Sequence, residues 1–310
     1  MKASTLVDGS VIDPSTIDLW RTRKDKERFQ WSSLALLTPA FALLIILFLI
    51  PVGYAAYLGF TNLTLVGPTA VKWGYTGMAN LHRLNSDTEF RSSLGLSAFF
   101  VGGSIVGVLI FGYWLASLLM RSTPWVRVVV GGVVVIAWMM PAITAGMTWY
   151  ASTTAGGTFA TLTGLSNSDF LGSYPLLVVT IANIWSQTGF AMLVFGAALR
   201  NIPSEILEAA DVENASRFQR FRLIVLPMLR PTMTAIVLLV ALLSLANFSL
   251  IYVMTQGGPG NATNILPLYS YQQAFQFNNL AYGALIGNVM VVIAAIFGVL
   301  YVRVATRRSR

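Results

Sequence analysis

Two groups of polar residues in this sequence could do chemistry, and neither is suited to breaking covalent bonds. The first is a charged stretch from Glu208 to Pro227, which carries acids, arginines and phenylalanines between two charge-free apolar runs. The second consists of uncharged amides and hydroxyls inside the apolar runs. Cysteine is absent, His82 is the single histidine, and no lysine follows a glycine, which excludes thiol catalysis, metal sites rich in Cys or His, and a phosphate-binding loop for ATP. The remaining chemistry is docking of a protein surface and hydrogen bonding to a neutral solute.

The composition indicates what must position these groups. Hydrophobic residues make up 55% of the 310 residues, charged residues make up only 10%, and the mean hydropathy is +0.69. Soluble domains carry roughly 25% charged residues, so the chain is predicted to be an all-α membrane protein embedded in a lipid bilayer. The net charge of +8 is interpreted as a signal of membrane topology and not of nucleic-acid binding.

The charge-free intervals predict the membrane-spanning helices. About 20 apolar residues cross the hydrocarbon core at a rise of about 1.5 Å each. The interval from Pro231 to Val302 is too long for one span, and its polar middle divides it in two. We therefore expect a six-helix domain over residues 32–305, after a polar tail of residues 1–31 and before a basic end of residues 306–310. The predicted spans cover about residues 34–58, 92–120, 128–150, 174–199, 232–254 and 281–302.

The basic residues predict the orientation of these spans. If the N-terminus is cytoplasmic, the segments on that side hold 17 of the 20 Lys and Arg residues, and the outer segments hold only Lys72, Arg83 and Arg91. Because Lys and Arg concentrate in cytoplasmic loops, we expect both termini and the charged stretch to face the cytoplasm. The loops that then face outward are 59–91, 151–173 and 255–280.

The charged stretch and the residues just before it have the pattern of a helical hairpin. Asn201 is expected to cap a first helix with Pro203 in its first turn. Asn214 is expected to make the turn with a positive φ, since Asn tolerates the left-handed conformation. A second helix should run over residues 215–226 and end at Pro227. Such a hairpin could instead lie on the headgroups, with its arginines against anionic lipid.

The hairpin resembles the EAA loop by which permeases of ATP-binding-cassette importers dock on their ATPase subunit. The family pattern of Glu-Ala-Ala, a turn, Ala, a spaced Phe and Ile, and Leu-Pro is matched in register at Glu208, Ala209, Ala210, Ala215, Phe221, Ile224, Leu226 and Pro227. Glu213 and Asn214 depart from the usual Asp and Gly. The resemblance implies a coupling loop over residues 201–231, with Phe218 also on its contact face. It further implies that ATP and Mg²⁺ are bound by the separate ATPase and that this chain binds no cofactor.

A second motif narrows the resemblance to carbohydrate importers. The loop that contains Gly257, Gly258, Pro259 and Asn261 is similar to the one between the last two spans of the first membrane subunit in the maltose and glycerol-phosphate group. Membership implies a type I importer fold, a second related six-span permease, two copies of an ATPase and an extracytoplasmic solute-binding lipoprotein, in the plasma membrane of a bacterium. The outer loop is then a candidate contact for the binding protein, or it is only a solvated connector.

The residues inside the predicted spans limit the class of solute. No span contains Asp, Glu, Lys, Arg or His, and ion or proton pathways usually need such groups. A neutral polyhydroxylated solute needs amides, hydroxyls and aromatic faces, and the candidates for its path are Asn183, Trp185, Gln187, Asn247, Ser249 and Tyr252. Alternatively, the amides join helices and the aromatic residues form interfacial belts.

The expected function is therefore import of a sugar or related solute by alternating access, driven by a separate ATPase. A permease for another small solute, such as a polyol, glycerol phosphate or an amino sugar, is the alternative. A polytopic membrane enzyme would need convergent titratable groups, which the spans lack, and a channel would not need a charged hairpin of this form.

Overall fold

The structure is a computed structural model in which the chain divides into two units, Met1–Tyr54 and Ala55–Arg310. The residues that it describes are 6–7, 10–11, 31–164 and 168–306. Most of the predicted N-terminal tail and the last part of the basic C-terminal end lie outside these ranges. The two units are described separately below.

The first unit contains a small hairpin and most of the first predicted span. β1 (Leu6–Val7) pairs antiparallel with β2 (Ser10–Val11). α2 (Trp31–Leu44) continues through a π-helical turn, η2 (Ile45–Leu49), into α3 (Ile50–Leu58), which reaches the second unit. This apolar helix is long enough to cross a membrane.

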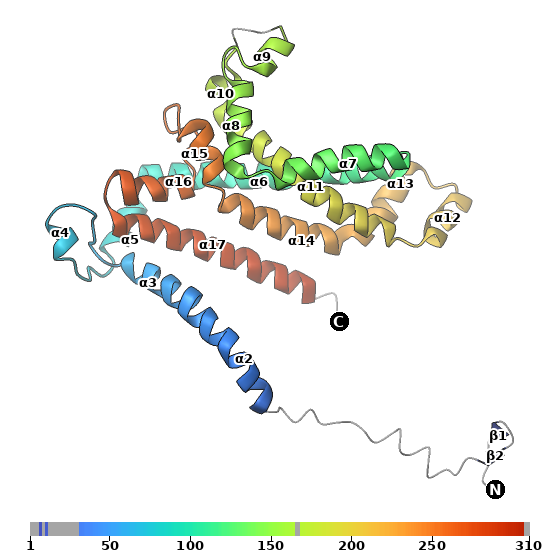
Figure 1. The fold of residues 1–310 in the computed structure, drawn as a ribbon, viewed down its shortest axis with the longest axis horizontal. Helices are drawn as coiled ribbons and strands as arrows, with labels where there is room; N and C mark the ends of the chain where they lie inside the picture. The colour runs from blue at the N-terminus through green and yellow to red at the C-terminus, as the bar shows by residue number, and fades with distance from the viewer. Residues whose placement is uncertain (1–5, 8–9, 12–30, 165–167, 307–310) are drawn as a thin grey trace. The chain divides into compact units, whose positions relative to one another are not determined.

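Four long helices of the second unit run side by side and form a bundle (Figure 1). Glycines let two of them approach closely. A Cβ added at Gly107 would collide with Ile184, and a Cβ added at Gly112 would collide with Ala191, so larger residues there would push the helices apart. The bundle helices are α6 (Thr88–Arg121), α11 (Pro175–Arg200), α14 (Leu226–Leu245) and α17 (Leu280–Thr306).

The third predicted span is broken near its middle. α7 (Pro124–Met139) and α8 (Ala142–Thr153) meet at a bend of 105°. Pro141 causes the break, because it has no N–H to donate and disfavours helical geometry at the residue before it; Met140 is accordingly extended, with ψ 131°. The described residues contain five helices that could each span a membrane, or six spans if this bent pair counts as one. The predicted all-α membrane fold is confirmed.

A second break divides the interval over which the sequence predicts the fifth span. α14 ends at Leu245, and the short helix α15 (Ser249–Thr255) follows. Asn247 Oδ1 accepts a hydrogen bond from the backbone N–H of Leu250 (3.4 Å), which caps the first turn of α15. α8 and α15 then pack together so tightly that a Cβ added at Gly146 would lie 3.2 Å from Val253.

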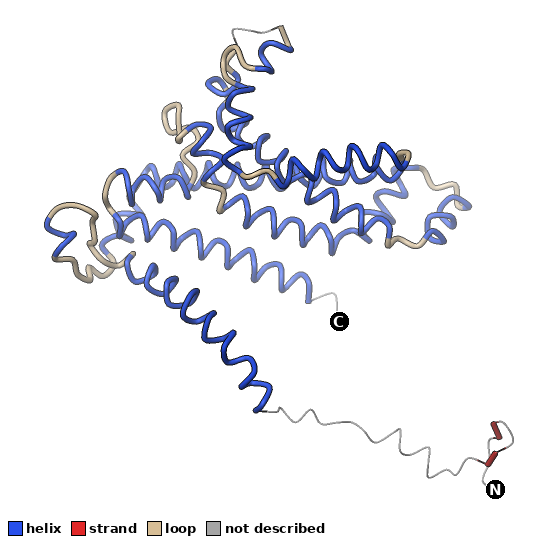
Figure 2. Tube along the Cα trace, viewed as in Figure 1, coloured by secondary structure: helices blue, strands red, loops and turns tan. Residues whose placement is uncertain are grey.

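Short helices surround the bundle, and α8 to α10 project away from it (Figure 2). Apart from α8, which belongs mostly to the predicted third span, they occupy the loops that the sequence predicts to be outside the membrane. Their bounds are α4 (Pro68–Val71), α5 (Ala79–Ser86), α9 (Thr158–Leu162), α10 (Phe170–Ser173), α16 (Leu266–Tyr271) and the π-helical turn η4 (Gln272–Gln276).

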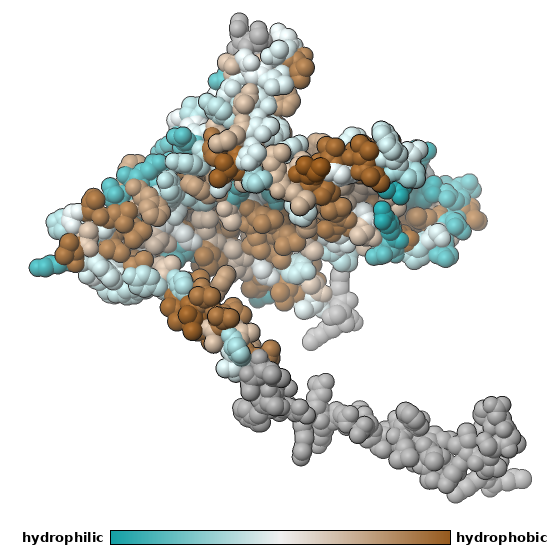
Figure 3. Space-filling model, viewed as in Figure 1, coloured by the Kyte–Doolittle hydropathy of each residue, from teal (hydrophilic) through white to brown (hydrophobic). Residues whose placement is uncertain are grey.

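The surface of the second unit is divided by hydropathy (Figure 3). Hydrophilic residues gather over α12 (Ser204–Val212) and α13 (Arg217–Arg220) at one end of the bundle, whereas hydrophobic residues cover its middle. On α17, Val292 and Ile296 are more than half exposed. An apolar belt of this kind is what a helix bundle presents to lipid.

Asp87 joins three helices at the end of the bundle that α6 begins. Its Oδ1 accepts a hydrogen bond from the N–H of Phe90 (3.1 Å) and so caps α6. Its Oδ2 accepts hydrogen bonds from the hydroxyls of Tyr269 on α16 (2.6 Å) and Tyr282 on α17, both of which are buried. Partial burial raises the pKa of Asp87, but the hydrogen bonds outweigh it and hold the pKa below its ordinary value.

Asp87→Asn should lower the free energy of unfolding by about 1–3 kcal/mol at neutral pH, because asparagine retains the cap but replaces a charged acceptor of two buried hydroxyls. A carboxyl group with a lowered folded pKa stabilises the protein above its unfolded pKa of about 4 and loses this contribution as the pH falls through the folded pKa. The melting temperatures of the two purified proteins should therefore converge at low pH. Asp169→Asn, which changes an exposed cap of α10, is the matched control. A gap in melting temperature that does not change with pH would contradict the assignment.

Candidate functional site

The charged stretch forms the helical hairpin that its pattern predicts. α12 and α13 are joined by a tight turn in which Asn214 has φ 53°, so the prediction of a positive φ is confirmed. The backbone N–H of Ala215 donates to the carbonyl of Ala210 (2.9 Å), and that of Asn214 donates to the carbonyl of Asp211 (3.0 Å). These bonds satisfy carbonyls at the end of α12 and fix the reversal of the chain.

The two hairpin helices begin differently from the prediction. Asn201 does not cap α12; it ends α11, and α12 begins at Ser204 after an extended Pro203. α13 has a capping box that the sequence analysis missed. Ser216 Oγ accepts from the N–H of Gln219 (3.2 Å), and Gln219 Oε1 accepts from the N–H of Ser216 (2.8 Å). The Ser-x-x-Gln spacing was the signal that could have predicted it.

The prediction that the second helix ends at Pro227 is wrong. α13 passes through a π-helical turn, η3 (Phe221–Val225), directly into α14, and Arg217–Leu245 forms one helix of 29 residues. Pro227 lies half-buried in the first turn of α14. The π-helical turn just before it adds one residue to the helical ring, which accommodates the missing N–H without ending the helix. The hairpin is therefore continuous with a membrane span.

Side-chain contacts tie the hairpin to the rest of the bundle. Asp211 of α12 and Arg220 of α13 form an ion pair of 2.8 Å. The ring of Phe221 lies 5.2 Å from that of Tyr113 on α6, and Tyr113 packs edge-on against Phe195 on α11 at 5.9 Å. The covalent chain and these contacts link the hairpin to three membrane helices, α6, α11 and α14.

The hairpin exposes apolar side chains on a polar element. Phe218 is 67% exposed and Val212 is 81% exposed. Val212 was not among the predicted contact residues, although its place one helical turn after Glu208 could have suggested it. Exposed apolar surface that is surrounded by polar residues marks interaction sites. The hairpin is therefore suited to dock on another protein.

The other predicted hairpin residues differ in accessibility. Ala210 is buried at 7% exposure and packs inside the hairpin, so it offers no surface for a partner. Ala215 and Phe221 are half-buried. The other predicted residues on the surface of the hairpin are Glu208, Ala209, Glu213 and Asn214, which are exposed.

Asn214→Gly should be neutral or mildly stabilising, because glycine adopts a positive φ without steric cost. Asn214→Val should cost about 1 kcal/mol or more, since a β-branched residue fits this region poorly. Thermal melts of the purified variants would measure both effects. A matched Glu213→Val variant, one residue earlier and at φ −74°, should be much closer to wild type; equal losses at the two positions would contradict the backbone argument.

Five uncharged polar side chains form a network in the middle of the bundle. Asn183 Nδ2 donates to Ser104 Oγ (2.7 Å) and to Ser244 Oγ (2.9 Å). Gln187 Nε2 donates to Asn183 Oδ1 (3.0 Å) and to Ser244 Oγ (3.0 Å). Asn247 Nδ2 donates to Asn183 Oδ1 (2.9 Å). The network joins α6, α11, α14 and the break before α15.

The members of this network are not equally accessible. Asn183 is 0% exposed and uses all four of its hydrogen-bonding positions, so in this conformation it joins helices and has no surface for a solute. Gln187 is 7% exposed, and among the described residues nothing donates to its Oε1. Asn247 is half-buried and faces the break in the helix.

Tyr252 belongs to an aromatic cluster that begins next to Asn247. Phe248 stacks on Tyr252 with ring centres 5.0 Å apart, and Tyr271 lies 4.9 Å from Phe248. Phe275, 56% exposed, extends the cluster at 5.4 Å from Tyr271. The i, i+4 spacing of Tyr271 and Phe275 could have predicted that these two rings lie on one helix face. Their contact with α15 depends on the fold.

The remaining predicted path residues, Trp185 and Ser249, are not among the stacked rings of this cluster. The ring of Trp185 is 6.1 Å from that of Trp149, against an apolar pocket between α6, α7 and α11. Ser249 is half-buried at the start of α15. The structure therefore places Asn247 next to the aromatic cluster of Tyr252, whereas the ring of Trp185 pairs with Trp149.

The Gly-Gly-Pro loop is compact and anchored. Gly257 (φ 95°) is buried and Gly258 is half-buried, whereas Pro259 and Asn261 (φ 62°) are exposed at the tip. Asn261 Nδ2 donates to Glu89 Oε2 at the start of α6 (3.2 Å). Only the tip of this loop is available to another protein.

Known proteins confirm the resemblance of the sequence to importer permeases. The family of binding-protein-dependent transport system inner membrane components matches residues 108–310. The chain belongs to this family. The permease is 32% identical over 275 residues to a probable ABC transporter permease protein of Pyrococcus horikoshii, which covers 84% of this chain and 90% of the relative. It is 30% identical over 240 residues to the trehalose/maltose transport system permease protein MalF of Thermococcus litoralis, which covers 76% of this chain and 81% of the relative.

A solved structure has the same fold. The permease matches a chain of a bacterial alginate ABC transporter in complex with alginate pentasaccharide-bound periplasmic protein, with a TM-score of 0.74, 18% identity, and coverage of 94% of this chain and 99% of that chain. The permease is accordingly a multi-pass membrane component of a transport system and not an enzyme. The described part of the chain holds no group of three His, Asp or Glu residues that could bind a metal ion.

Proposed function

We propose that this permease is the first membrane subunit of a sugar importer and that its hairpin docks on an ATPase subunit, which binds ATP and Mg²⁺. One observation carries the proposal: the second helix of the exposed hairpin is the start of the 29-residue helix Arg217–Leu245, which ends two residues before Asn247 and the aromatic cluster. At about 1.5 Å per residue, this helix reaches roughly 43 Å from the hairpin to that cluster. A rigid element of this kind can convert ATPase closure into alternating access.

The proposed assembly contains a second related permease, two ATPase copies and an extracytoplasmic binding lipoprotein. The concentration of Lys and Arg around the hairpin favours a cytoplasmic position for this end and for both termini. The tip of the Gly-Gly-Pro loop is then on the outer side, where Pro259 and Asn261 are placed to meet the binding protein.

The polar and aromatic side chains near the break between α14 and α15 favour a sugar as the solute. Asn247 offers an amide, Tyr252 and Tyr271 offer hydroxyls, and the rings of the cluster offer faces for the apolar sides of sugar rings. The names of the similar trehalose/maltose permease and of the alginate transporter with the same fold agree with this class. A polyol, glycerol phosphate or an amino sugar is the alternative.

Reconstitution tests the proposal directly. The permease, its partner permease and the ATPase should hydrolyse ATP slowly in liposomes and faster when a sugar-loaded binding protein is added. ATPase activity that does not respond to any loaded sugar-binding protein would overturn the assignment.

Thiol labelling tests the orientation of the permease in the membrane. Because the chain has no cysteine, the single variants Asn214→Cys and Asn261→Cys each carry one thiol at a known place. The thiol of the Asn214→Cys variant should react with a membrane-impermeant reagent only after permeabilisation, and that of the Asn261→Cys variant should react without it. Reaction of the Asn214→Cys variant in intact cells would contradict a cytoplasmic hairpin.

A further inference from the structure

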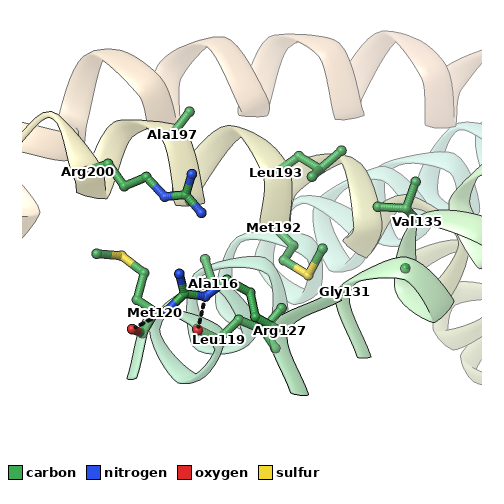
Figure 4. A pocket seen from close by; sticks show the side chains of 12 residues that line it. Ala116, Leu119, Met120, Arg127, Gly131, Val135, Met192, Leu193, Ala197 and Arg200 are labelled. Carbon is green, nitrogen blue, oxygen red and sulfur yellow. Dashed lines mark hydrogen bonds between the residues drawn. The ribbon is translucent and has the colours of Figure 1, made fainter. Parts of the chain in front are cut away.

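A pocket that the transport mechanism does not use opens at the hairpin end of α6, α7 and α11 (Figure 4). It has a volume of about 430 Å³. Its walls are formed mainly by aliphatic residues such as Val135, Met192 and Leu193, and two arginines, Arg127 and Arg200, are its charged members. Because amides and hydroxyls are missing from this lining, the pocket is poorly suited to a sugar.

The two arginines make the pocket positive. Arg127 is held at the end of α6, where its Nε donates to the carbonyl of Leu119 (2.9 Å) and one terminal nitrogen donates to that of Met120 (3.0 Å). Arg200 is exposed in the last turn of α11, and its guanidinium reaches over the pocket toward Arg127 (Figure 4). In the part of the chain that the structure describes, neither arginine has an ion pair with an acid. Two guanidinium groups that have no acidic partner favour an anion between them.

The aliphatic part of the pocket lining continues beyond the two arginines. A Cβ added at Gly132 or at Gly196 would meet no atom within 4 Å, so neither glycine is needed for packing inside the chain. Glycine inside a helix is destabilising relative to alanine. Their combined effect is to deepen an apolar groove that begins at the arginines and leads along α7 and α11 into the hydrophobic belt.

We propose that this pocket binds an anionic glycerophospholipid, with the phosphate between Arg127 and Arg200 and one acyl chain in the groove over Gly132 and Gly196. The arginines lie at the ends of membrane helices, where lipid headgroups are found. Basic pockets between helices at this depth bind anionic lipids. The site neighbours the hairpin, because Met120 lines both this pocket and the one under α12 and α13. A bound lipid would therefore hold the ends of α6 and α11 together next to the coupling element.

The purified full transporter, titrated with dioleoylphosphatidylglycerol or dioleoylphosphatidylcholine and analysed by native mass spectrometry, tests the site. Wild type should retain phosphatidylglycerol preferentially. Arg200→Gln should weaken this retention about fivefold, since one basic residue near the surface contributes about 1 kcal/mol. Gly132→Leu should weaken it at least as much by filling the groove. Arg303→Gln and Gly298→Leu, at exposed or open positions on α17, should leave retention unchanged.

Three outcomes would overturn the proposal. The first is equal retention of phosphatidylglycerol by wild type, Arg200→Gln and Gly132→Leu. The second is sensitivity to Arg200→Gln alone, which would indicate a site for a phosphate group without an acyl chain. The third is exclusive capture of a protein subunit, and of no lipid, by a photocrosslinking residue at Gly196 in the assembled transporter, which would assign the groove to a protein interface.

Discussion

Glu208→Ala and Ala209→Trp should each reduce ATPase activity stimulated by the loaded binding protein by at least about tenfold, while the permease still inserts and assembles in the membrane. Both positions are exposed on α12, so the substitutions leave the interior of the hairpin unchanged. Glu208 supplies a charge and Ala209 a small side chain that permits close approach of a partner. A loss of 1.4 kcal/mol in docking corresponds to about one decade in affinity. Hydrolysis and transport in reconstituted liposomes measure the effect.

The choice of position matters because adjacent alanines have different surroundings. Ala210 is 7% exposed, so Ala210→Trp would disrupt the hairpin and could not separate docking from folding. Ala305→Trp, at an exposed position near the end of α17, is the matched control and should retain stimulation. If both α12 variants kept the wild-type stimulation of ATPase activity, the hairpin would not be part of the coupling interface.

Asn183→Ala and Asn247→Ala should have different consequences although both residues belong to one network. Asn183 is buried with four hydrogen bonds to Ser104, Ser244, Gln187 and Asn247. Its loss leaves buried polar groups unpaired, which costs about 1–3 kcal/mol, and should lower the melting temperature of the assembled complex. Asn247→Ala removes a half-buried amide next to the aromatic cluster and should lower uptake by up to about tenfold, because a hydrogen bond contributes about 0.5–1.5 kcal/mol.

Uptake normalised to purified complex, measured with thermal melts of the same samples, separates the two effects. Basal ATPase activity should persist in Asn247→Ala. Gln256→Ala, at an exposed position beyond α15, serves as a control that alters neither the network nor the cluster. If Asn247→Ala leaves normalised uptake intact and lowers only the melting temperature, its amide joins helices as that of Asn183 does, and the solute passes elsewhere.

The amino-acid sequence was sufficient to predict the class of this protein and the position of its hairpin. Charge-free apolar intervals of about 20 residues or more indicate membrane helices, because a helix satisfies its backbone polar groups within the segment. The turn at Asn214 was predictable because few residues other than Gly and Asn adopt a positive φ at low cost. The Glu-Ala-Ala pattern lies within one continuous stretch of chain, so it can be recognised without knowledge of the fold.

The sequence was less informative where a helix is interrupted or continues against its local signals. Pro141 breaks α7 from α8, whereas Pro227 is accommodated inside a continuous helix after a π-helical turn. The two prolines have the same local chemistry. Their different outcomes depend on neighbouring hydrogen bonds and packing, which propensity does not encode.

The tertiary structure alone decided which polar residues meet and which are accessible. Asn183 and Ser244 are 61 residues apart, and Asp87 and Tyr282 are 195 residues apart, yet each pair is hydrogen-bonded. Residue type indicated that Asn183 could bind a solute, but burial among α6, α11 and α14 assigns its amide to the helices. The physical reason is that hydrogen-bonding capacity belongs to the residue, whereas the partner that satisfies it is selected by packing between segments distant in the chain.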